Sequence, residues 1–495
     1  MVNIKTIAKN FFYIMSAQFM AQLLNFVYML VIARILKPEG FGILSFGLVF
    51  TGIFGGIVNI GLRKVHVRDL AREPEAIGDY TGRIIALKVL LAIPVAGVMG
   101  VLVNVMGYPE LTRQVVYILI VAFLLDAIVT NYYAVFQSQQ NLRFESFATV
   151  FRGVVLVGTA FFAEWQGHGV IFLAWVYLLI NTLILTYCML VYGKEYPALA
   201  FCVDRAFIRE KIREATPFGL VGIFEIIYHW IGTVMLSLTH GDAVVGWYNA
   251  AYRLFLVTLF IPSVVSVVIF PVMAQMFKTD PNHLRNVSFK YYKYLLVIGS
   301  LVAMEVAMFS DELVRLLFGN AYAPSAAALR ILMICCVLMS INGAFVRLLE
   351  STNQQLLLTK ICGAAATTNV LLNLVLIPRY SFIGASMATV VSESVITLAV
   401  VVAASRSRFK FEDGLLRGQF GRHFVRVAGS AMVAAASIGL LTPYINMYAA
   451  IVLSSLIYVG VMVLVRGINQ EDWGVVMRLL RRNSGVTPSI KGSQP

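Results

Sequence analysis

Apolar stretches of about twenty residues recur along the whole chain, and each is long enough to cross the hydrocarbon core of a bilayer as a helix. Of the 495 residues, 59% are hydrophobic and 13% are charged. Soluble domains carry about 25% charged residues. A soluble fold of this size has too little interior to bury so much apolar surface. We therefore predict an all-α integral membrane protein with about 14 transmembrane helices.

The spans are separated by short polar segments, and their boundaries follow from hydropathy. In chain order they are Asn10–Leu36, Phe41–Leu62, Ile84–Met106, Gln114–Phe136, Phe147–Trp165, Val170–Tyr192, Pro217–Leu238, Trp247–Met276, Tyr291–Phe309, Ala326–Leu349, Leu356–Ile377, Ile383–Ala404, Phe424–Leu441 and Tyr448–Val465.

Basic residues indicate how the chain is oriented. Most of the 39 Lys and Arg residues lie in alternate loops between the spans. Because basic loops remain in the cytoplasm, we predict a multi-pass protein of the prokaryotic inner membrane with both termini cytoplasmic. The basic residues do not gather in one patch, which argues against a nucleic-acid partner.

Two short patterns recur six spans apart. The segment 136–142 after the fourth span resembles 349–355 after the tenth, and 41–42 at the start of the second span resembles 245–246 at the start of the eighth. An even number of spans preserves direction, so we predict two parallel six-helix lobes around a central cavity. The predicted parts are an N-lobe (1–193), a C-lobe (194–405), two further helices (406–466), and a cytoplasmic interfacial helix with a disordered tail (467–495).

Six titratable residues inside predicted spans most need an explanation, because a charge there is costly and normally faces protein or a water-filled cavity. Arg152 and Arg253 are candidates for binding an anionic headgroup, because guanidinium groups match phosphate. The other four are candidates for proton or sodium coupling: Asp126, Glu225, His229 and Glu393. The alternative is structural, with opposite charges pairing across helices; for His229 a packing role is favoured.

Basic residues near helix ends are weaker candidates. Lys88, Arg347 and Lys360 lie near predicted cytoplasmic ends, where a long side chain can extend to the interface, and Arg34 lies near an external end. Arg34, Arg347 and Lys360 are kept as further candidates for substrate binding.

The sequence lacks the motifs of several classes of enzyme. There is no P-loop motif and no metal-ligand spacing, and the predicted external loops are short. We therefore expect no catalytic residues, no metal and no cofactor, and interpret the chain as a carrier rather than an enzyme.

Three segments resemble a known family. The link 33–42 (ARILKPEGFG) is similar to the opening signature of polysaccharide transporters in the MOP exporter superfamily. The stretch 245–254 (VGWYNAAYRL) is similar to that family's G-x-Y-x-A-A-x-R-L motif, on which Arg253 falls. The region from Asn369 to Glu393 resembles its pattern in helices 11 and 12. The charges Glu225 and His229 depart from the helix-7 pattern of the family.

The resemblance implies a V-shaped, two-lobed flippase. It implies transfer of an undecaprenyl-diphosphate-linked oligosaccharide, such as an O-antigen or capsule unit, to the outer leaflet by alternating access. It also implies an ion or potential as driving force, and polysaccharide polymerases and glycosyltransferases as possible functional partners. A peptidoglycan-precursor flippase, a multidrug antiporter of the same superfamily and a membrane-embedded glycosyltransferase remain alternatives.

Overall fold

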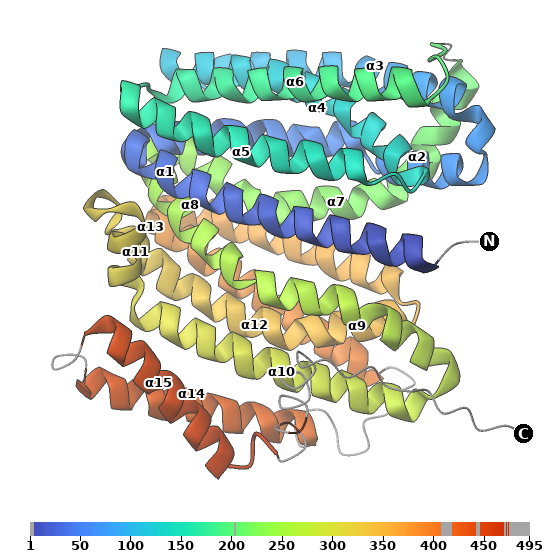
Figure 1. The fold of residues 1–495 in the computed structure, drawn as a ribbon. Helices are drawn as coiled ribbons and strands as arrows, with labels where there is room; N and C mark the ends of the chain where they lie inside the picture. Colours follow the sequence, from blue (N-terminus) through green and yellow to red (C-terminus); the bar gives the residue numbers. More distant parts are fainter. Residues whose placement is uncertain are drawn as a thin grey trace, which may run out of the picture. The chain divides into compact units, whose positions relative to one another are not determined.

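The computed structural model describes residues 4–201, 204–406, 418–441 and 446–469, together with Asp472 and Gly474. The regular elements of these residues are helices (Figure 1). In chain order they are α1 (Ile4–Asn59), α2 (Leu62–Arg72), η1 (Pro74–Ala76), α3 (Ile77–Val105), α4 (Glu110–Ser138), α5 (Arg143–Gln166), α6 (Val170–Glu195), α7 (Arg205–His240), α8 (Asp242–Thr258), α9 (Phe260–Thr279), α10 (Pro281–Met308), α11 (Ser310–Phe318), η2 (Asn320–Tyr322), α12 (Ser325–Ser351), α13 (Gln355–Arg406), α14 (Gln419–Leu441) and α15 (Met447–Leu464).

The predicted helical membrane architecture is confirmed. Among the described residues, 11 helical segments are long and apolar enough to cross a membrane. Two of them, of 44 and 52 residues, exceed the length of one crossing. Each contains one residue with non-helical dihedrals, Lys37 in α1 and Ser381 in α13, so each consists of two helices that meet at a kink. The count of 14 crossings stays a prediction.

The predicted span Trp247–Met276 is wrong as a single helix. It is interrupted at Leu259, between α8 and α9. Pro262 lies three residues beyond the interruption and has no backbone N–H, so it cannot donate to the carbonyl of Thr258. The proline therefore accounts for the position of the break.

The chain forms two compact units that interleave in sequence. The first comprises Met1–Val257, Ser310–Cys335 and Gln354–Ile396, and the second comprises Thr258–Phe309, Cys336–Asn353 and Thr397–Pro495. In the first unit α1 packs along α5 and α7, and α4 contacts both α3 and α6. In the second unit α10 contacts α9, α14 and α15. The predicted lobes, 1–193 and 194–405, stay a prediction, and most of the predicted tail, 467–495, lies outside the described residues.

The backbone repeats the pattern seen in the sequence. Residues with positive φ recur in pairs that are 204 to 214 positions apart. Lys37 and Gly241 share unusual dihedrals, with φ 56° and ψ 177° in the first and φ 82° and ψ 174° in the second. Gly107 with Gly319 and Gln140 with Asn353 are two further pairs, whereas Gly167 and Ser381, 214 positions apart, differ in ψ, 28° against −137°. The recurrence of turn geometry supports an internal duplication.

Two glycines of the first unit pack against each other's helices in a reciprocal manner. A Cβ atom on Gly42 would lie 1.8 Å from the carbonyl oxygen of Asp242, and one on Gly246 would lie 2.0 Å from that of Pro38. Gly42 and Gly246 are 204 residues apart, and so are Pro38 and Asp242. A contact in which equivalent residues exchange roles indicates local two-fold pseudosymmetry. Only glycine permits this approach of two backbones.

Candidate functional site

Two of the predicted site residues form an ion pair within the first unit. Arg152 of α5 donates from Nη2 to Oδ1 of Asp126 in α4 over 2.8 Å. The two side chains retain 31% and 38% of their exposure. The pair therefore joins a candidate for substrate binding to a candidate for ion coupling, and it satisfies both charges within the protein.

Lys88 corrects a sequence-based expectation. The sequence predicts that its side chain extends to the interface, but the side chain is completely buried. Its Nζ donates to Oδ1 of Asn59 over 2.8 Å and to Oγ1 of Thr130 over 2.9 Å. Thr130 lies one turn beyond Asp126 on α4; the Arg63 guanidinium and, more weakly, the Asp126 carboxylate act electrostatically on the ammonium group in opposite directions. The prediction failed because α1 and α4 each supply an oxygen atom that holds the ammonium group inside.

Arg253 is partly buried in the first unit, with little polar compensation. Its guanidinium lies 5.8 Å from the centre of the Phe41 ring, and the Tyr28 and Tyr177 side chains are near enough to act on it electrostatically. Its Nε is buried and has no hydrogen-bond partner among the described residues. A buried donor without a partner carries the cost of its lost hydration, which an anionic ligand would offset.

The other three candidates for ion coupling, Glu225, His229 and Glu393, lie on α7 and α13. The Tyr228 hydroxyl donates to Oε2 of the buried Glu393 over 2.5 Å. His229 Nδ1 lies 2.7 Å from the Tyr252 hydroxyl in α8, a contact that favours a packing role for the imidazole. Glu225 lies one turn before His229 on α7, and its side chain is exposed. Tyr228 is therefore the residue through which α7 reaches Glu393.

The weaker basic candidates are placed differently. Arg34 donates from Nε to the carbonyl oxygen of Leu317 over 2.8 Å and from Nη2 to that of Leu316, so it caps the C-terminal end of α11. Arg347 donates to Ser266 and Glu350. Lys360 is exposed on α13. The bonds of Arg34 and Arg347 support structural roles for both.

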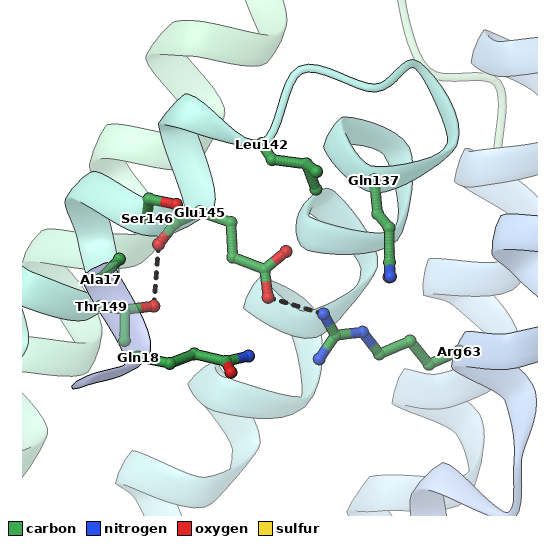
Figure 2. A pocket seen from close by; sticks show the side chains of 8 residues that line it. All are labelled: Ala17, Gln18, Arg63, Gln137, Leu142, Glu145, Ser146 and Thr149. Carbon is green, nitrogen blue, oxygen red and sulfur yellow. Dashed lines mark hydrogen bonds and ion pairs between the residues drawn. The ribbon is translucent and has the colours of Figure 1, made fainter. Parts of the chain in front are cut away.

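A polar cavity of about 320 Å³ lies in the first unit (Figure 2). Residues from α1, α2, α4 and α5, together with the turn between α4 and α5, line it: Ala17, Gln18, Arg63, Gln137, Leu142, Glu145, Ser146 and Thr149. Arg63 donates from Nη2 to Oε1 of Glu145 over 2.7 Å. Sequence reasoning missed this cavity, because its residues come from four helices and carry no common motif.

An ionic cluster connects α2, α3 and α7 beside the predicted spans. Asp69 of α2 accepts hydrogen bonds from the Tyr80 hydroxyl over 2.6 Å and from Lys211 Nζ over 3.0 Å, and Arg68 joins Asp69 to Glu214. Burial raises the pKa of the Asp69 carboxyl, but hydrogen bonds from Arg68, Tyr80 and Lys211 outweigh burial and hold the pKa at about 2. The cluster fastens the short α2 helix to the N-terminal part of α7.

A family model described as polysaccharide biosynthesis protein matches residues 7–277, which is more than half of the chain. This chain belongs to the polysaccharide biosynthesis protein family. The matched region contains Lys88, Asp126, Arg152 and Arg253, as well as the eight residues of the cavity.

Curated relatives are about a quarter identical to this chain over the parts that align. The probable low-salt glycan biosynthesis flippase Agl15 of Haloferax volcanii is 27% identical over 34% of this chain and 36% of its own length. The capsular polysaccharide biosynthesis protein CapF of Staphylococcus aureus is 23% identical over 78% of this chain and 96% of its own length. The chain spans about half or less of the first curated relatives it matches.

Solved structures share the fold. The lipid II flippase MurJ in an inward closed conformation has a TM-score of 0.75 and 12% identity, covering 91% of this chain and 98% of the other. An inward-facing multidrug resistance MATE transporter of the MOP superfamily has a TM-score of 0.62 and 14% identity, covering 78% and 94%. This chain therefore has the fold of the MOP superfamily transporters, as the motif resemblance predicts.

Proposed function

We propose that this protein is a flippase that moves an undecaprenyl-diphosphate-linked oligosaccharide from the inner to the outer leaflet for surface polysaccharide synthesis. The protein lies in the inner membrane with both termini cytoplasmic, and it alternates between inward-open and outward-open states. The lipid tail of the substrate stays in the bilayer while the polar headgroup of the substrate crosses through the protein.

The observation that carries this proposal is the buried Nε of Arg253. This donor has no hydrogen-bond partner among the described residues, although the partly buried side chain lies within a predicted span. A carrier of cationic drugs would gain nothing from a buried guanidinium, whereas a diphosphate offers it charge and acceptors. Lys88 and the Arg152–Asp126 ion pair lie in the same unit. The family to which the chain belongs supports the glycan part of the proposal.

The test is transport in proteoliposomes. A fluorescent undecaprenyl-diphosphate glycan is reconstituted with the wild-type protein, with Arg253→Ala and with Arg143→Ala. Arg143 is a matched control because its side chain is exposed and its ion pair with Glu195 spans 3.9 Å. We expect at least a tenfold loss of flipping in Arg253→Ala and wild-type flipping in Arg143→Ala. Equal flipping by all three proteins would remove the role of Arg253.

Two other carriers are consistent with the fold and are separated in the same liposomes. Flipping of a peptidoglycan lipid precursor in preference to the oligosaccharide would favour a precursor flippase, the activity named for MurJ. Export of cationic drugs with no lipid flipping would favour an antiporter of the MATE kind.

The coupling ion is proposed to act on the acidic residues. A proton or sodium ion binds at Asp126 or Glu393, each of which accepts a hydrogen bond from another side chain, with Glu225 and His229 as further candidates. Imposed pH and sodium gradients are applied in turn, and Glu393→Gln and Asp126→Asn are compared with wild type. Loss of the response to one gradient, with passive flipping retained, identifies the ion and its residue.

A further inference from the structure

The cavity of Figure 2 offers a set of polar groups that the proposed transport of a diphosphate does not use. Gln18 comes from α1, Arg63 from α2, Gln137 from the end of α4, and Glu145 from the start of α5. Their side chains point into the same space (Figure 2). Three of these four positions lie beside segments that the positive-inside rule places at the cytoplasmic side. The cavity therefore faces the side on which a lipid-linked glycan is assembled.

Two amide groups in the cavity have no hydrogen-bond partner among the described residues. Gln18 and Gln137 are both exposed and line the cavity, and neither side chain makes a hydrogen bond within the described part of the chain. Each carboxamide offers two N–H donors and a carbonyl acceptor. The Ser146 hydroxyl adds a further donor and acceptor in the wall. The cavity thus presents neutral groups that both donate and accept.

The charges of the cavity cancel. Among the described residues that line the cavity only Arg63 and Glu145 are charged, and they pair with each other over 2.7 Å. A phosphate would need an excess of positive charge, and a cation an excess of negative charge. Leu142 and Ala17 provide a small apolar surface beside the polar groups. A ligand that carries several hydroxyl groups around an apolar ring matches this lining.

We propose that this cavity binds one sugar residue of the transported glycan. Its volume of about 320 Å³ is at the lower end of the range of small-molecule sites, about 300 to 1,000 Å³. Hydroxyl groups of the sugar bond to the amides of Gln18 and Gln137 and to the outer edges of the Arg63–Glu145 pair. The apolar face of the ring packs on Leu142. The cavity would select the glycan, while Arg253 binds the diphosphate.

The role in transport rests on the proposed function, so the binding test uses free sugars. Full-length protein in detergent is examined by saturation-transfer NMR with glucose, galactose, N-acetylglucosamine and N-acetylgalactosamine at millimolar concentration. The variants are Gln18→Ala with Gln137→Ala, and Gln139→Ala as control. Gln139 lies in the same turn but does not line the cavity. Both substituted glutamines are exposed, so we expect the double variant to fold as the wild type does.

Transfer to at least one sugar, at least fivefold weaker in the double variant and unchanged in Gln139→Ala, supports the proposal. No transfer to any of the four sugars, or equal transfer in all variants, would overturn it. Inorganic diphosphate that displaces the sugar and loses its effect in the double variant would also overturn it, because the site would then recognise phosphate. Sugar binding without any lipid flipping would contradict the proposed function and leave the sugar site standing.

Discussion

Two turns have a similar backbone conformation but different side chains: the turn between α4 and α5, and the turn between α12 and α13. Gln140 in the first and Asn353 in the second are 213 residues apart and have φ values of 55° and 61°. Five residues beyond Gln140, Glu145 pairs with Arg63 in the polar cavity, whereas the position five residues beyond Asn353 is Leu358. The repeat therefore preserves the path of the chain, and each copy carries its own side-chain chemistry. The backbone conformation at Gln140 and Asn353 is common to the two halves, whereas the side chains around the two turns differ.

The largest expected effect comes from breaking the backbone contact that the two copies share. Gly42→Val and Gly246→Val each place a side chain within about 2 Å of a carbonyl oxygen of the other copy. We expect each variant to lose most of its folded, monodisperse protein after detergent extraction. Gly52→Val in α1 is the matched control, because a Cβ atom there meets nothing within 4 Å. Normal yields of either variant would show that the copies do not depend on this crossing.

Two buried lysines sharpen the comparison, because one has neutral partners and the other a carboxylate. Lys88 contacts Asn59 and Thr130, whereas Lys293 in the second unit contacts Asp472 over 2.5 Å. Lys293→Met leaves a buried carboxylate without its cation, and we expect it to cost about 3 kcal/mol of stability. In Lys88→Met the groups that lose a hydrogen bond, Asn59 and Thr130, are uncharged, so we expect little loss of stability. We expect at least a tenfold loss of flipping in the same variant.

Thermal unfolding in detergent and flipping in liposomes measure the two effects separately. Flipping by Lys88→Met at the wild-type rate would assign Lys88 to structure. An unchanged unfolding midpoint in Lys293→Met would show that the hydrogen bonds from Tyr294 and Asn469 are enough for Asp472.

A smaller effect is expected where the copies differ in residue type at the same backbone conformation. Lys37 and Gly241 adopt a region that is almost confined to glycine and that costs other residues about 1 to 3 kcal/mol. We expect Gly241→Ala to destabilise the protein by about 2 kcal/mol and Lys37→Gly to stabilise it by about 1 kcal/mol. Midpoints of thermal unfolding measure both. Shifts of the same sign would mean that the two turns are not equivalent.

The smallest expected effect concerns pH and the cluster around Asp69. The pKa of this carboxyl is about 2 in the folded protein and 3.8 ordinarily. Because the folded pKa is lowered, the stabilisation is complete above about pH 4 and is lost as the pH falls toward 2. We expect about 1 kcal/mol from this group, since the cluster is partly exposed. Asp69→Asn should lose this part of the acid-induced fall in the unfolding midpoint. An identical pH profile for the variant and the wild type would contradict it.

The sequence alone determined the membrane-spanning helical fold, the kinship with polysaccharide transporters and the presence of an internal repeat. The reason is that lipid solvates each apolar segment separately, so hydropathy acts locally and is readable along the chain. It also identified Asp126, Arg152 and Arg253 as residues whose charges need explanation, since a charge within an apolar span is costly wherever it lies.

The tertiary structure decided which partners the charged side chains have. Arg34 lies more than 280 residues from the carbonyl groups it caps, and Lys88 is buried by oxygen atoms from α1 and α4. The cavity needs α1, α2, α4 and α5 to converge. Hydrogen bonds and ion pairs depend on separations of about 3 Å, and such separations follow only from how the helices pack. Hydropathy specifies that a segment crosses the membrane and leaves open which residues it faces.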